Sequence, residues 1–120
     1  MRRGTSQHGQ GDPVAALPGA RPRPSAVIVP SEKATIGIVQ AAYARRITVP
    51  RYLSIVAMLG ESASELVAPP LTTVTFPAED LGRIAAELLI RRLDGGDPTP
   101  RQVFVRPGLT VRGSTAPPRA

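Results

Sequence analysis

The sequence predicts an α/β fold built on a parallel strand–helix–strand unit, followed by a crossing amphipathic helix and short C-terminal strands. Continuous apolar runs at residues 26–29 and 53–58 are typical of strands that are buried on both faces of a parallel sheet. A helical pattern lies between these two runs, and this order favours a right-handed parallel connection. A longer helical pattern with one apolar stripe follows further along the chain.

The first helix is predicted from Glu32 to about Arg46, with Ser31 as its N-cap. Its apolar residues form two stripes instead of one. The first stripe holds Ile36, Val39, Tyr43 and Ile47, and the second holds Ala34, Ile38 and Ala42. A helix that is apolar on two sides needs two partners. We expect one partner to be the sheet and the other to be a further segment or another subunit.

The second helix is predicted to begin at Pro77, after a third strand at residues 71–76, and to stop at Gly95-Gly96. Its apolar spacing predicts one buried face, made by Leu81, Ile84, Ala85, Leu88 and Leu89. Two i,i+4 ion pairs are expected, Glu79 with Arg83 and Glu87 with Arg91. Residues 102–106 and 109–112 are two further strand candidates.

Composition and charge divide the 120-residue chain into a predicted domain at 25–116, a disordered leader at 1–24 and a tail at 117–120. The net charge of +6 is spread along the chain and is not concentrated in a basic block. With few aromatic residues there is no stacking platform for bases. The absence of cysteine and of any apolar run long enough for a membrane span favours the cytoplasm.

Candidate catalytic groups are few. Residues 60–64 superficially resemble a nucleophile elbow around Ser62, but the one histidine, His8, lies in the leader. The carboxylate pairs Glu61 with Glu65 and Glu79 with Asp80 are ordinary on helix surfaces. We therefore expect no catalytic residue, no metal ligand and no cofactor.

Small ligands of open α/β sheets lie beyond the carboxyl ends of the strands, which here means residues 30–32 and 59–61. The side chains of Ser31 and Glu32 can accept hydrogen bonds from the hydroxyl groups of a ligand. The simpler interpretation is that Ser31 is an ordinary N-cap and that Glu32 is a favourable charge in a first helical turn.

The residues also resemble the last third of the effector-binding domain of the LacI/GalR family of transcription regulators. The resemblance spans about Pro24 to Pro117. Each motif alone is weak evidence for the family, but their succession in the expected order is specific to it. In chain order the matching segments are 24–29, Gly37, 49–50, 53–56, 69–74, 81–83, 87–89 and 112–115.

This resemblance implies a partial periplasmic-binding-protein-like fold that binds a sugar or related polyol and dimerises, with contacts at Ile36, Gln40 and Tyr43. Ser31 and Glu32 stand where the family often has Asn-Asp, whose Asp commonly bonds the effector. At residues 57–60 the family's Asp-Asp pair is absent. The helix from Pro77 would lack its usual neighbours, which implies that its apolar face needs another partner or stays exposed.

We therefore expect the effector-sensing and dimerisation part of a LacI-type DNA-binding repressor or related regulator. We expect it to be a truncated fragment that lacks the helix-turn-helix headpiece, so the chain alone should not bind DNA specifically or associate with a membrane. The alternative is a small basic nucleic-acid-binding protein that uses the arginines of the leader. A hydrolase using Ser62 is a more distant alternative.

Overall fold

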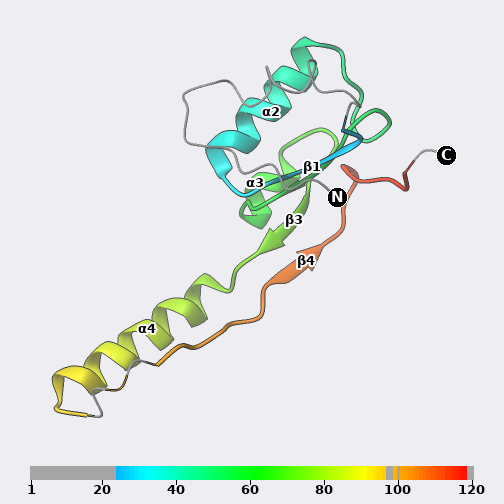
Figure 1. Ribbon diagram of the computed structural model, residues 1–120. Coiled ribbons are helices and arrows are strands. Elements are labelled where there is room, and N and C mark those ends of the chain that lie inside the picture. The colour runs from blue at the N-terminus through cyan, green and yellow to red at the C-terminus, as the bar shows by residue number, and fades with distance from the viewer. Residues whose placement is uncertain (1–23, 97–98, 100, 119–120) are drawn as a thin grey trace.

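The computed structural model describes residues 24–96, 99 and 101–118, which form one four-stranded sheet with helices attached to it (Figure 1). The strands are β1 (Ala26–Val29), β2 (Ser54–Ala57), β3 (Thr72–Thr75) and β4 (Gly108–Thr110), and they lie in this order across the sheet. The first three strands are parallel, and β4 runs antiparallel to β3. The predicted α/β class and the parallel strand–helix–strand unit are confirmed.

The compact part of the molecule is organised around β2. Its core consists of side chains from β1, β2, the flanking loops and helix α2 (Glu32–Ala44). The buried members of this core are Val29, Ile38, Leu53, Ile55, Ala57, Leu59 and Leu71. Of the two apolar stripes predicted for α2, the one with Ile38 and Ala42 is therefore the stripe that packs inward.

The other predicted stripe of α2 is largely uncovered in the described structure. Ile36 is 51% exposed and Tyr43 is 88% exposed, while Val39 and Ile47 are half-buried against the core. Within the described residues, the outer side of this helix is therefore an open surface.

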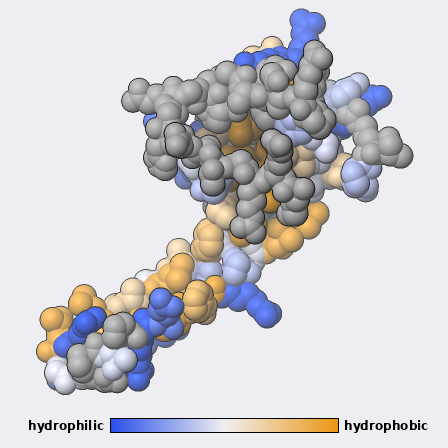
Figure 2. All heavy atoms as spheres, viewed as in Figure 1, coloured by the Kyte–Doolittle hydropathy of each residue, from blue (hydrophilic) through white to orange (hydrophobic). Residues whose placement is uncertain are grey.

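An arm leaves the compact part through the β3–β4 pair and carries helix α4 (Ala78–Leu93), as Figure 1 shows. A return segment, residues 101–107, runs back alongside α4 to β4. The arm makes the molecule long, with extents of 58 × 30 × 27 Å. No residue of α4 is buried, and Figure 2 shows apolar residues gathered on the arm. The prediction that one face of α4 is buried is therefore wrong for the described chain. The structure instead has the exposed apolar face that the family resemblance implied.

Helix α4 ends where the sequence predicts. Gly95 adopts a φ of 76°, the left-handed conformation that suits glycine after a helix, and the amide of Gly96 donates to the carbonyl of Arg91 at 2.9 Å. Its ion pairs differ from the two predicted. Arg83 pairs with Glu87 at 2.9 Å and with Asp80 at 3.4 Å, and these hydrogen bonds raise the pKa of the Arg83 guanidinium.

Three further expectations need correction. Strand β1 lies at the sheet edge with Ile28 70% exposed, so it is not buried on both faces. Residues 102–106 are extended but not part of the sheet, because no described strand pairs with them. The segment after β2, for which no helix was predicted, contains the short helix α3 (Glu61–Glu65). Within the described residues no helix has the length and apolar character needed to cross a membrane. Residues 1–23 of the predicted leader (1–24), with His8, and residues 119–120 of the predicted tail lie outside the described residues.

Candidate functional site

The carboxyl edge of the parallel strands brings together the segments that sequence reasoning placed at a ligand site. The last residues of β1 and β2, Val29 and Ala57, are register partners, so residues 30–32 and 59–61 follow at the same edge. Strand β3 is parallel to both, and its carboxyl end leads into the arm. The edge is therefore bordered by the first turn of α2, the start of α3 and the base of the arm (Figure 1).

Ser31 is held by the start of α2. Its side-chain oxygen accepts from the amide of Ala34 at 3.4 Å, as expected of an N-cap. Its carbonyl oxygen accepts from the amide of Thr35 at 2.9 Å and from the buried Thr35 hydroxyl at 2.8 Å. The hydroxyl proton of Ser31 remains available for a ligand, but the capping role alone accounts for the residue.

Glu32 is the first residue of α2 and is exposed. Within the described residues its carboxylate has no hydrogen bond and no ion pair. A carboxylate at the carboxyl edge of the sheet can accept hydrogen bonds from a polar ligand, and the start of the helix favours its negative charge.

The other candidate groups are engaged in the fold. A Glu61 carboxylate oxygen accepts from the Thr110 hydroxyl at 3.4 Å, which links α3 to β4. Glu65 lies 3.8 Å from the Arg112 guanidinium. Ser62 is an exposed residue of α3, with no histidine among the described residues. The described part of the chain also contains no group of acidic or histidine side chains that could hold a metal ion.

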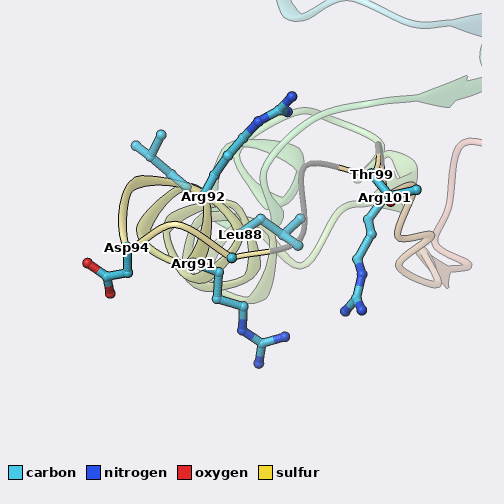
Figure 3. A pocket seen from close by; sticks show the side chains of 8 residues that line it. Leu88, Arg91, Arg92, Asp94, Thr99 and Arg101 are labelled. Atoms are coloured by element: carbon cyan, nitrogen blue, oxygen red, sulfur yellow. The ribbon is translucent and has the colours of Figure 1, made fainter.

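Of the hollows that lie away from this edge, two bear on the predictions. One, of about 590 Å³, is at the tip of the arm, where Leu88 points toward the return segment and Arg91 and Arg92 point to opposite sides (Figure 3). The other, of about 630 Å³, is mostly apolar and lies beside the C-terminal half of α2. Gln40 and Tyr43, two of the residues expected to make dimer contacts, line this second hollow, and Ile36 does not.

Comparison with known proteins decides the family. Residues 2–115 match the family model of the periplasmic binding protein-like domain. The chain belongs to this family. Over 93 residues it is 37% identical to the HTH-type transcriptional regulator MalR of Streptomyces coelicolor, a match that covers 77% of the chain and 27% of MalR. The chain thus spans about a quarter of the length of such a relative.

Solved structures agree with the assignment. A LacI family regulator from Mycobacterium smegmatis is 36% identical with a TM-score of 0.72, over 88% of this chain and 41% of that one. The regulator CelR, solved as a complex with cellobiose, is 29% identical with a TM-score of 0.74, over 84% of this chain and 32% of that one. The expected LacI/GalR resemblance and the partial periplasmic-binding-protein-like fold are confirmed, and the chain forms part of a LacI-type effector-binding domain. These relatives are named as transcription regulators and not as enzymes.

Proposed function

We propose that the chain senses a sugar or related polyol at the carboxyl edge of its sheet, through Glu32 and, secondarily, Ser31. The observation that carries this proposal is the exposed Glu32 carboxylate, which lacks a partner within the described residues and stands at the edge where ligands of open α/β sheets bind. The likeness to a regulator solved with cellobiose supports a sugar as the ligand class. A regulator that senses a metabolite in this way would work in the cytoplasm.

The binding should be weak for this chain alone. A cleft gains affinity by enclosing its ligand, and the described residues form one wall together with the base of an arm. Water reaches the exposed Glu32 carboxylate. Removing this carboxylate should therefore weaken the binding of the ligand by no more than about tenfold, which corresponds to about 1.4 kcal/mol.

Calorimetry with cellobiose, ribose and a linear polyol tests this proposal. The wild-type chain should give a weak signal with at least one of them, and Glu32→Ala should reduce it. Asp94→Ala is the control, because Asp94 is also an exposed carboxylate and lies at the far end of α4, away from this edge. Tight binding by the chain, or equal losses in the two variants, would show that the site lies elsewhere.

We further propose that the outer face of α2 supports self-association, with Ile36, Gln40 and Tyr43 in contact. All three are exposed, and the apolar hollow beside Gln40 and Tyr43 could receive a side chain from a second copy. Removing these apolar side chains from water would drive the contact.

Specific DNA binding by the 120-residue chain is not part of the proposal. Within the described residues every helix is followed or preceded by a strand, so no two consecutive helices form a helix-turn-helix unit. Fluorescence anisotropy with labelled duplexes tests the nucleic-acid alternative. Binding that falls steeply with salt and disappears when residues 1–24 are deleted would favour that alternative.

A further inference from the structure

The outer edge of β1 presents backbone groups that no strand of the described chain pairs with. The carbonyls of Ser25 and Val29 accept hydrogen bonds at 2.8 and 2.9 Å from the β2 side. Because the backbone groups of a strand point alternately to its two sides, the amides and carbonyls of Ala26 and Ile28 point away from β2. Both residues are exposed, and β1 is the last strand on this side of the described sheet. The edge can therefore accept a further strand.

The two edges of the sheet differ in the residues that protect them. Strand β4 starts at Gly108, follows Pro107 and is flanked by Arg106 and Arg112. Glycine, proline and charged residues at an edge discourage pairing with another strand. Strand β1 reads AVIV and contains none of these residues. Of the two edges, the one at β1 is therefore suited to pairing with a strand of another molecule.

The β1 edge is complementary to a second copy of itself. In an antiparallel pair, the outward amide and carbonyl of Ile28 meet the outward carbonyl and amide of Ala26 in the other copy. The same pair forms again on the other side of Val27, which lies opposite its own copy on a two-fold axis. One symmetry operation thus provides a partner for every outward backbone group of the strand.

Helix α2 leaves room for this pairing. The flank of α2 that carries Tyr43 lines the apolar hollow together with residues 66–69, which lead toward β3. At 3.6 residues per turn, the opposite flank, toward the β1 edge, carries the small residues Ala34, Gly37 and Ala41. A Cβ at Gly37 would meet nothing within 4 Å. The two copies of this flank can therefore face each other across the two-fold axis, at the helix spacing of about 8–10 Å that is usual in proteins.

We propose that the outer edge of β1 is a self-association surface, on which the β1 of a second copy pairs antiparallel and joins two four-stranded sheets into one. The edge is separate from the sugar site at the carboxyl ends of the strands and from the contact at Ile36, Gln40 and Tyr43. Backbone hydrogen bonds set the direction and the register of the pair. Because β1 has four residues, the contact is small and the dimer is weak.

Sedimentation velocity of the full chain tests the edge. The wild type should dimerise at concentrations on the order of tens of micromolar. Ile28→Pro removes an outward amide but no hydrogen bond to β2, so it should keep the fold and raise the dimer dissociation constant by at least about tenfold. Val103→Pro is the control, because Val103 is an exposed valine of the return segment, which pairs with no described strand. A monomeric wild type, or a dimer indifferent to Ile28→Pro, would overturn the proposal.

Hydrogen exchange followed residue by residue with NMR tests the pairing without any substitution. The amides of Val27 and Val29 face β2 and should be protected at every protein concentration. The amides of Ala26 and Ile28 should gain protection only as the concentration rises. Protection of these two amides in dilute samples would show that another part of the same chain covers the edge, and fast exchange in concentrated samples would show that no strand pairs with it. Either result contradicts the proposal.

Cysteine cross-linking tests the register, because the chain contains no cysteine. Val27 should meet its own copy in a pair without hydrogen bonds, whose Cα atoms lie about 4.5 Å apart and so within reach of a disulfide. Val27→Cys should therefore form an intermolecular disulfide under mild oxidation. Ile28→Cys should not, since its own copy lies diagonally across the pair at about 7–8 Å, although random collisions would favour this more exposed position. Stronger cross-linking of Ile28→Cys than of Val27→Cys would exclude the proposed register.

Discussion

The Ser114 hydroxyl donates a hydrogen bond to the carbonyl oxygen of Ile55, 2.5 Å away. The hydroxyl oxygen of Ser114 also accepts from the amide of Thr72 at 2.7 Å, and the backbone carbonyl of Ser114 accepts from the amide of Ile55 at 2.9 Å. Ser114 is fully buried. One residue near the C-terminus therefore ties together β2 and β3 where the two strands begin.

Ser114→Ala should destabilise the chain by about 1–3 kcal/mol, because it leaves the buried amide of Thr72 without an acceptor. Urea denaturation followed by circular dichroism measures this loss. Ser62→Ala is the control, since Ser62 is exposed on α3, and its stability should be unchanged. If Ser114→Ala were as stable as the control, water would have to replace the lost acceptor.

Arg112 makes a second, partly buried link of the C-terminal segment. Its guanidinium donates to the Thr73 hydroxyl at 2.8 Å and to the Leu71 carbonyl at 3.1 Å, and its side chain is 12% exposed. Arg112→Lys keeps the charge but has one nitrogen in place of two, Nη1, which bonds Thr73 and Leu71, and Nη2, which faces Glu65, so we expect a loss of about 1.5–3 kcal/mol. Arg92→Lys on the exposed face of α4 is the matched control. Equal unfolding midpoints for the two variants would contradict this role.

Much of the fold could be predicted from the sequence because local patterns determine it. The apolar runs around Val29 and Ile55 become parallel strands, Ser31 caps α2, and Gly95 ends α4. Each of these signals depends on residues within a few positions of one another. The family resemblance added the order of the segments, which the comparisons confirm.

The expectations that are wrong depended on partners that a local pattern cannot supply. Periodicity identified the apolar face of α4 but not what would cover it, and the extended residues 102–106 have no described strand to pair with. Helix α3 was missed because five residues are too few to show a helical period. The site residues Ser31 and Glu32 lie where predicted, and their binding of an effector stays a prediction.

Substitution of alanine at two glycine positions should change the stability of the chain in opposite directions. Gly95→Ala forces a side chain into the left-handed conformation and should destabilise α4 by about 1–2 kcal/mol. Gly37→Ala lies inside α2 with open space around its Cβ position, and should stabilise the chain by about 0.5–1 kcal/mol. Thermal melts followed by far-ultraviolet circular dichroism compare the two. A stabilising Gly95→Ala would show that the helix does not end in the left-handed conformation.

Tyr43→Glu tests the proposed self-association surface on α2. Tyr43 is 88% exposed, so the charge should leave the stability of the monomer unchanged. If α2 self-associates, the variant should dimerise less than the wild type, because each copy would place an unpaired charge in the contact. Sedimentation at rising concentration measures this, with Ser62→Glu as the control, because Ser62 is an exposed residue of α3 outside this surface. An assembly pattern identical to that of the wild type would exclude α2 as a contact.

The rate of amide hydrogen exchange should differ between the compact part of the molecule and its arm. The amides of β2 lie in the buried core and should exchange slowly, whereas α4 has no buried residue and should open locally without unfolding that core. Mass spectrometry of peptides from dilute and concentrated samples compares the two regions, with β2 peptides as the internal reference. Protection of α4 that equals that of β2 at every concentration would show that the arm is already covered within a single chain.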